Sequence, residues 1–453
     1  MTGLQNQMGT KPVLPLLMSM ALPPMLSMLI QSMYNVVDGI FVARLSNEAF
    51  TAVSLAYPLQ NMTVALAVGF GVGANAFIAR QLGEGDTEKV NHAASMGMLF
   101  TLLHSLLFAV IGWSFSRPFL QMFTQDAQVL QMSVEYARIV VCLCFGSMFH
   151  IYVEKLFQAT GNMLVPMILQ GVGAVINIVL DPVFIFGMFG MPALGVKGAA
   201  IATVIGQVTA GTIAMVWFFA SKSGMSISLR QMIPDKTITA KIYGVAIPST
   251  VMGAMPSVLV SVMNAVIAEF HVLAVAVFGL YFKLQTFVYM PANGLIQGMR
   301  PLVSYNYGAG KGKRMNQVVY WSLVVTAILM GIGTVLFWLL PRQIMQVFGA
   351  DAQMMELGVS MLRLTSLGFL VSTLGTVLAG CFEALGYGVQ SLLITLLRQL
   401  FIIPPLAMLL GSMWGLDGVW VAFPVAELLS ALVAVALYKS ALSKMNQTRF
   451  KAE

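Results

Sequence analysis

The sequence predicts an all-α integral membrane fold with twelve transmembrane helices in two pseudo-symmetric six-helix lobes. Three observations predict it: composition, a series of apolar stretches, and an internal repeat. Of the 453 residues, 58% are hydrophobic and 9% are charged, whereas soluble domains carry roughly 25% charged residues. A soluble fold could not bury this much apolar surface, but the hydrocarbon core of a bilayer accommodates it.

Twelve apolar stretches follow one another along the chain, each long enough for a spanning helix of about 20 residues. They lie at residues 13–37, 50–79, 91–114, 133–157, 163–189, 193–220, 240–268, 274–304, 317–340, 358–382, 388–412 and 417–440. The longest connector, near residues 221–240, separates the sixth stretch from the seventh. We therefore predict an N-terminal lobe over residues 1–225 and a C-terminal lobe over residues 226–453.

An internal repeat relates the two lobes. A shift of 225 residues produces a long ungapped register, which pairs Pro23 with Pro248, Gln60 with Gln285, Asp126 with Asp351, and Gly161 with Gly386. After a gap of five residues the offset becomes 220, and Gly195 and Gly198 pair with Gly415 and Gly418. Six helices return the chain to its starting side, so both halves insert with the same orientation. Transporters with such repeats bind substrate at the repeat interface and work by alternating access.

Basic residues concentrate in alternate connectors, which indicates membrane orientation. One set is rich in Lys and Arg, and the other is sparse; the rich set includes Arg80, Lys89, Lys222, Arg230, Lys236, Lys241, Lys311, Lys313 and Arg314. By the positive-inside rule both termini are cytoplasmic, in a multi-pass protein of the cell (inner) membrane. No removable signal peptide is expected, because the N-terminus lacks a small-residue cleavage site.

The sequence offers no chemistry typical of an enzyme or of a nucleic-acid-binding protein. Three cysteines lie in predicted spans without disulfide or zinc spacing, and the four histidines show no metal-ligand spacing. No nucleophile–base pair or phosphate-binding loop occurs. The basic residues form no nucleic-acid stripe. We therefore expect no enzymatic activity, no cofactor and no nucleic-acid partner. We expect membrane lipid to surround the protein.

Three carboxylates fall inside predicted spans, where charge is costly and usually marks function. They are Asp38, Glu154 and Asp181, and Asn177 precedes Asp181 by four residues, on the same helix face. A poorly hydrated cavity destabilises the anionic form of a carboxylate, so the group takes up a proton more readily. Alternatively, carboxylate, amide and hydroxyl oxygens form a site for a cation such as sodium. Both alternatives remain open.

The repeat places apolar residues opposite these three acids. At the 225 offset Asp38 corresponds to Met263 and Glu154 to Ala379, while Asp181 corresponds to Leu406, or to Phe401 at the later offset. The duplicated fold does not require carboxylates at these positions. This asymmetry predicts an ion-coupling function in the first lobe.

The second lobe has fewer candidate groups. Arg398 and Glu427 fall in the last two spans, and we expect a buried structural ion pair between them. Glu383 follows the tenth span. Lys283 replaces Pro58 of the first lobe, and either gates cations or extends to the interface by snorkelling. Pro23, followed by Pro24, lies inside the first span and removes a backbone hydrogen bond, which favours a bend there.

Five motifs together resemble one known family. YNVVDGIFVARL in the first span, FIARQLGEGD after the second, FQATGN after the fourth, INIVLDP in the fifth and LVSYNYGAGK after the eighth are similar to the multidrug and toxic compound extrusion (MATE) family. Each motif alone is weak, but their order within a two-lobe repeat is specific. The resemblance covers about residues 12–440, and is strongest to the DinF-like branch.

The resemblance implies efflux of small organic, often cationic, compounds in exchange for inward protons or sodium ions. It implies a coupling site in the first lobe, made by Asp38, Asn177 and Asp181, with Thr203 as a further ligand. It also implies that Pro23 is the helix hinge and that Tyr34 lines the cavity, to which we add Gln31 and Asn35 of the same helix. Family members often have Asn where Glu154 stands, so Glu154 is an additional candidate coupling group.

Two other classes are weaker alternatives. A lipid-linked precursor flippase of the same wider superfamily is expected to line its cavity with several basic residues, and the spans contain few. A membrane enzyme or signalling protein needs a catalytic constellation or a sensor domain, and neither occurs. The major facilitator superfamily is disfavoured, because its acidic–basic loop signature is absent between the second and third spans. The two lobes already make a complete pathway, so we expect a functional monomer.

Overall fold

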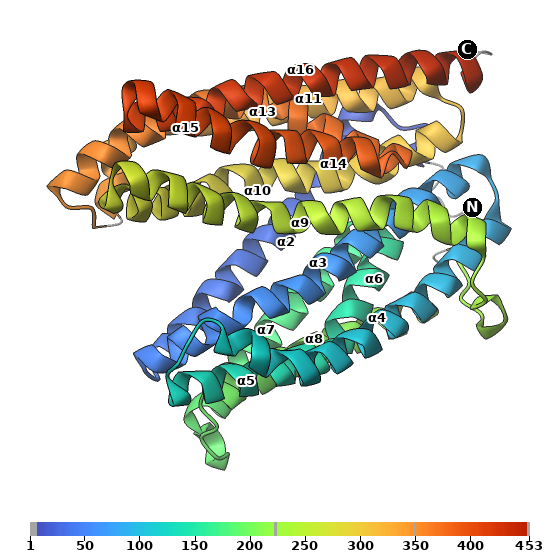
Figure 1. Ribbon diagram of the computed structural model, residues 1–453. Helices are drawn as coiled ribbons and strands as arrows, with labels where there is room; N and C mark the ends of the chain where they lie inside the picture. Colours follow the sequence, from blue (N-terminus) through green and yellow to red (C-terminus); the bar gives the residue numbers. More distant parts are fainter. Residues whose placement is uncertain (1–6, 222–223, 348, 451–453) are drawn as a thin grey trace. The chain divides into compact units, whose positions relative to one another are not determined.

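The computed structural model describes residues 7–221, 224–347 and 349–450, and within these ranges it contains helices and no β-strand (Figure 1). The α-helices are α2 (Val13–Ala43), α3 (Asn47–Glu84), α4 (Thr87–Gln121), α5 (Ala127–Cys142), α6 (Phe145–Ala159), α7 (Leu164–Phe186), α8 (Val196–Ala220), α9 (Lys236–Phe270), α10 (Val272–Gly308), α11 (Gly312–Leu339), α12 (Pro341–Val347), α13 (Ala352–Leu385), α14 (Gly388–Leu396), α15 (Ile403–Trp414) and α16 (Leu416–Thr448). The predicted all-α class is confirmed.

Eleven of the described helical segments are long and apolar enough to cross a membrane, and α5 with α6 makes a twelfth span bent by 44°. The predicted number of spans is confirmed, but the stretch at 133–157 is not one continuous helix. α5 ends at Cys142 and α6 begins at Phe145. A Cβ at Gly146 would lie 2.7 Å from Val208 Cα in α8, so the bend brings α6 very close to α8.

The eleventh span also has an internal irregularity. Between α14 and α15, residues Leu397–Ile402 form a turn of π-helix. Pro404 and Pro405 follow at the start of α15, and prolines lack the N–H that the regular helical ladder requires. The π-helical turn therefore comes directly before Pro404 and Pro405, whose backbone nitrogens cannot donate the regular α-helical hydrogen bonds.

The repeat is visible in the way equivalent helices begin and end. Asp126 Oδ1 caps α5 by accepting from the Gln128 and Val129 amides, and its repeat partner Asp351 caps α13 through the Met354 amide. Gly161 and Gly386 follow α6 and α13 with φ of 84° and 85°, a left-handed conformation that glycine adopts without strain. The same residues thus end the equivalent spans in both halves.

The chain forms two compact units, which we call unit 1 (Leu26–Ile247) and unit 2 (Met8–Met25 together with Pro248 onwards). The predicted boundary at residue 225 lies in the connector, whereas unit 1 extends further. The reason is that the connector docks on α4: the Ser226 and Ser228 amides donate to Asn91 Oδ1 and Ser95 Oγ at 2.8 and 3.0 Å.

Close helix contacts explain why the first part of α2 belongs to unit 2 and the first part of α9 belongs to unit 1. Within unit 2, a Cβ at Gly298 of α10 would lie 2.7 Å from the Met20 carbonyl of α2. Within unit 1, a Cβ at Gly73 of α3 would lie 2.4 Å from the Ile242 carbonyl of α9. These two glycines are repeat partners, so each unit uses the same device to hold its added helical segment.

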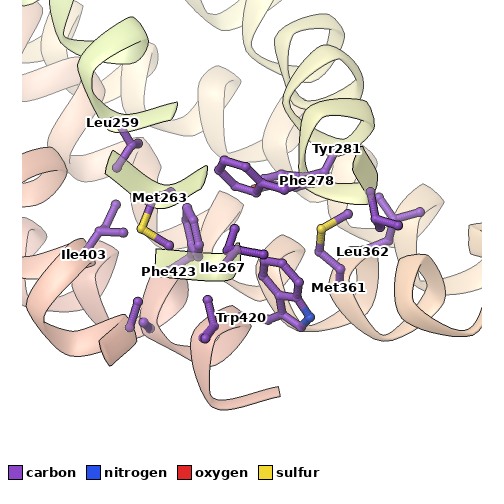
Figure 2. Packing of buried hydrophobic residues seen from close by; sticks show 14 of the residues in the cluster. Leu259, Met263, Ile267, Phe278, Tyr281, Met361, Leu362, Ile403, Trp420 and Phe423 are labelled. Carbon is purple, nitrogen blue, oxygen red and sulfur yellow. The ribbon is translucent and has the colours of Figure 1, made fainter. Parts of the chain in front are cut away.

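Each unit has its own apolar core. In unit 1 the core joins the end of α2 to α3, α5, α6 and the start of α8, and includes Val42, Leu59, Tyr136 and Met148. In unit 2 the core is rich in large side chains, and Figure 2 shows Met263, Phe278, Trp420 and Phe423 packed together. α13 packs against both α11 and α16, and these three helices contribute Met330, Met361 and Trp420 to this core; Figure 1 shows the helices of this unit.

Candidate ion-coupling site

A cluster of polar side chains lies inside unit 1, where α2, α7 and α8 meet. The carboxyl groups of Asp38 of α2 and Asp181 of α7 lie close enough to interact electrostatically. Asp181 is completely buried, and Asp38 is partly buried. The structure therefore brings together two predicted coupling carboxylates that are 143 positions apart in the sequence.

Amide and hydroxyl groups complete this cluster. Asn177 Nδ2 lies 3.4 Å from Asp181 Oδ1 and 3.4 Å from Thr203 Oγ1. The hydroxyls of Tyr34 and Tyr136 lie near Thr203 and interact with it. The four polar groups around the two carboxylates thus form one cluster, in which Asn177 and Thr203 are 3% and 2% exposed.

Helix geometry positions these residues. Tyr34 and Asp38 are four residues apart on α2, and Asn177 and Asp181 are four apart on α7, so each pair lies on one helix face. Two glycines let α7 and α8 approach: a Cβ at Gly206 would lie 3.1 Å from the Gly173 carbonyl. This close packing places Thr203, one turn before Gly206, against Asn177.

Two neighbouring carboxyl groups have the electrostatics of a candidate cation site. Like charges at hydrogen-bond distance repel, and a hydrogen bond between two carboxyls requires one shared proton. Asp38 Oδ1 is also buried without a hydrogen-bond partner among the described residues. An unsatisfied buried carboxylate oxygen is costly unless a proton or a metal cation binds there.

Glu154 lies in a different cluster, on α6. Glu154 Oε1 accepts hydrogen bonds from Lys155 Nζ at 3.0 Å and from Gln158 Nε2 at 2.7 Å. Lys155 is 5% exposed, and its backbone carbonyl accepts from Asn75 of α3. Among the hydrogen bonds of the described residues, none joins Glu154 to Asp38, and Glu154 instead forms an ion pair with Lys155.

The remaining predicted residues of unit 1 lie on or near α2. Tyr34 lies near Thr203, whereas Gln31 and Asn35 of the same helix are exposed. Pro23 lies inside α2, which continues as one helix from Val13 to Ala43, and the chain passes from unit 2 to unit 1 just after it, between Met25 and Leu26.

The sequence interpretation missed Tyr136 and Lys155. Tyr136 is 2% exposed and contacts both Thr203 and Gln60, the latter at 3.5 Å. The repeat contained a signal for it, because Tyr136 corresponds to Met361 at the 225 offset. A polar residue opposite an apolar partner marks this site in the same way as Asp38 and Asp181.

The two buried acids described in unit 2, Glu383 and Glu427, are paired with arginines. Arg398 Nη1 lies 3.3 and 3.4 Å from the two carboxylate oxygens of Glu427, which confirms the predicted structural pair. Glu383 accepts a hydrogen bond from Ser249 Oγ at 2.5 Å and forms an ion pair with Arg300. Lys283 is exposed on α10. Among the described residues there is no group of three or more His, Cys, Asp and Glu side chains placed to hold a metal ion.

Comparison with known proteins identifies the family. The family model described as MatE matches residues 23–183 and 248–409, which together are more than half of the chain. A relative from Staphylococcus haemolyticus, described as multidrug export protein MepA, is 28% identical over 432 residues, 95% of this chain and 94% of its own length. A protein of the same description from Staphylococcus aureus is 26% identical over 427 residues, with coverage of 94% and 93%.

Solved structures share the fold. The crystal structure of MATE in complex with MaL6 has a TM-score of 0.92 and 23% identity, covering 99% of this chain and 100% of that one. A MOP superfamily transporter from Pyrococcus furiosus has a TM-score of 0.91 and 22% identity, with 99% coverage of both chains. With a family model matched in both halves and this fold, the chain belongs to the MatE family and is a multi-pass membrane transporter rather than an enzyme.

Proposed function

We propose that the protein is a secondary active exporter of small organic compounds, driven by exchange for protons or sodium ions through the Asp38–Asp181 pair. Family membership and relatives described as multidrug export proteins support the export of drug-like compounds. Alternating access is the expected mechanism of a transporter built from two parallel repeats.

The proximity of the two carboxyl groups carries the proposal. One cation, either a shared proton or a sodium ion, removes the repulsion between Asp38 and Asp181 and satisfies the unpartnered Asp38 Oδ1. Thr203 and Asn177 supply further polar groups of the kind that hard cations prefer. Binding and release of that cation therefore changes the charge inside unit 1, which is the requirement for coupling.

Asp38 also lies on the helix most suited to transmit this change. α2 carries Pro23 and Pro24, each of which removes a backbone hydrogen bond and permits a bend. We propose that cation binding at Asp38 alters the curvature of α2 around Pro23, and that Tyr34, Asn35 and Gln31 present polar groups to the substrate. Glu154, already neutralised by Lys155, contributes to local charge balance and is a secondary candidate.

The test measures drug movement in sealed proteoliposomes under a proton gradient and then under a sodium gradient. Asp38→Asn replaces one carboxylate of the pair by a neutral amide of nearly the same size and shape. We expect wild-type protein to follow one of the two gradients, and Asp38→Asn to lose that dependence. Glu48→Gln, which neutralises an exposed carboxylate on α3, is the matched control and retains the gradient dependence.

The outcomes separate the hypotheses. Transport that persists unchanged in Asp38→Asn would overturn the site and make Glu154 the leading candidate. A protein that moves no compound under either gradient, yet moves a lipid-linked precursor across the bilayer, would overturn the exporter proposal in favour of a flippase. We propose that a single chain is the functional unit, that the protein resides in the cell membrane, and that both termini are cytoplasmic.

A further inference from the structure

Two equivalent loops of the repeat have opposite charge. In unit 1, the loop between α3 and α4 contains Glu84, Asp86 and Glu88, and its ion pairs are Arg80–Glu84 at 3.2 Å and Lys89–Asp86 at 2.6 Å. At the 225 offset the three acids become Ala309, Lys311 and Lys313 in the loop between α10 and α11, while Lys89 becomes Arg314. The fold therefore tolerates either sign here, and unit 2 has a concentrated positive charge.

Two cations of this loop, Lys311 and Arg314, donate to backbone carbonyl oxygens. Lys311 Nζ donates to the Gly9 carbonyl at 2.8 Å, and Arg314 donates to the carbonyls of Met8 and Lys11 at 3.2 and 2.5 Å. Backbone carbonyls satisfy these donors but carry no net charge. Within the described part of the chain, Lys11, Lys311 and Arg314 take part in none of the ion pairs.

The C-terminal end of α16 adds to the same surface. Arg449 donates to the Gly308 carbonyl at 3.0 Å and its guanidinium lies over the Tyr307 ring at 4.6 Å. The Phe450 ring lies against Gly312, at the start of α11. We call the residues Lys11, Lys311, Lys313, Arg314 and Arg449 the basic patch. In the described part of the chain, the three segments that contribute to it, residues 7–37, 272–347 and 428–450, contain no Asp or Glu.

The patch lies where helices enter the membrane. α2 begins at Val13, α10 ends at Gly308, α11 begins at Gly312 and α16 ends at Thr448, and each of these four helices is long and apolar enough to span. Several Lys and Arg residues at the ends of spanning helices attract anionic lipid headgroups, each adding to the attraction when close to the surface. A phosphate group also accepts several N–H donors at once.

We propose that the basic patch of unit 2 is a binding site for the headgroup of an anionic phospholipid, and that the equivalent loop of unit 1 is not. The exposed side chains of Lys11 and Lys313 provide the contacts, while Lys311, Arg314 and Arg449 hold the surface together and add positive potential. This proposal rests on membrane insertion and on the repeat, not on the coupling site.

The test measures lipid binding to the purified full-length protein. Quenching of tryptophan fluorescence by brominated phosphatidylglycerol is compared with quenching by brominated phosphatidylcholine in mixed micelles, and native mass spectrometry counts the retained lipids. We expect tighter binding of phosphatidylglycerol to the wild type. The double variant Lys11→Glu, Lys313→Glu should weaken that binding by about tenfold or more, because it reverses two charges.

The matched control is Arg230→Glu, Lys236→Glu, which makes the same charge change at two exposed residues of the connector after α8. Phosphatidylglycerol binding should change little in this variant. Equal weakening in both double variants, or equal binding of the two lipids by the wild type, would overturn a specific site. Complete displacement of phosphatidylglycerol by millimolar inorganic phosphate would also overturn it, since the patch would then recognise free phosphate.

Discussion

Unit 1 and unit 2 are copies of one helical plan, but they fill the same positions with opposite chemistry. Each residue of the polar cluster of unit 1 has an apolar repeat partner in unit 2. At the 225 offset the partners of Tyr34, Asp38, Tyr136, Asn177 and Asp181 are Leu259, Met263, Met361, Ile402 and Leu406. At the 220 offset the partner of Thr203 is Phe423. All six partners belong to, or pack against, the apolar core of unit 2, and Figure 2 shows four of them. A scaffold that is stable with a dry core does not need carboxylates there.

The buried acids that remain in unit 2 have a different environment. Glu427 and Glu383 each form an ion pair with an arginine, whereas Asp38 and Asp181 face each other. An acid that an arginine already neutralises has a low affinity for a further cation, whereas two adjacent acids have a higher one. We infer that a buried carboxylate is suited to ion coupling or to a structural role according to the group it faces, and that its position in a span does not decide this.

The largest expected effect is at the dyad. Asp181→Asn removes one of the two neighbouring carboxyls, so gradient-driven drug transport in proteoliposomes should fall to the background level. The double variant Arg398→Met, Glu427→Leu removes two buried charges from unit 2 and should retain coupling to the same ion. Loss of coupling in both proteins would mean that the two units do not differ in the way we infer.

The next effect is on stability in unit 2. Arg398→Met leaves Glu427 as an uncompensated buried charge, and we expect a loss of about 3–5 kcal/mol in the free energy of unfolding. Thermal unfolding in detergent micelles measures it. The double variant Arg398→Met, Glu427→Leu should regain most of that loss, because no charge remains buried. A single variant as stable as wild type would show that water or another group neutralises Glu427.

Close helix packing should give a smaller and equal effect in both units. Gly73→Ala and Gly298→Ala place a methyl group 2.4 and 2.7 Å from a backbone carbonyl, so each should lower stability by about 1–3 kcal/mol. Gly244→Ala, whose Cβ would meet nothing within 4 Å, is the control, and should be neutral or stabilising by up to about 1 kcal/mol. A large difference between Gly73→Ala and Gly298→Ala would break the structural equivalence.

The smallest effect is expected at the edge of the dyad. Thr203→Val removes the hydroxyl that contacts Asn177, Tyr34 and Tyr136, at a cost of about 1 kcal/mol, or roughly fivefold in apparent affinity for the coupling ion. The ion concentration for half-maximal transport measures it. Thr212→Val on the same helix, where the exposed hydroxyl only donates to the Val208 carbonyl, should leave that concentration unchanged. If the two variants behave alike, Thr203 is not part of the ion site.

Much of the fold could be predicted from local properties of the sequence. Apolar length sets the number of spans, because a bilayer of fixed thickness needs about 20 residues per helix, and the repeat sets the two halves. The bend between Cys142 and Phe145 could not be predicted, because no proline marks it and it depends on packing against α8. The unit boundary at Ile247 also depends on packing, where the connector docks on α4.

The candidate site, like the fold, was determined partly by the sequence alone and partly by tertiary packing. The sequence by itself determined that Asp38, Glu154 and Asp181 are acids inside spans, and that the repeat does not require them. Only the tertiary structure decided which acid has which partner: Asp181 meets Asp38 from another helix, and Glu154 meets the lysine beside it. The physical reason is that the burial cost of a charge depends on the groups within a few ångströms, and helix packing brings those groups from distant parts of the chain.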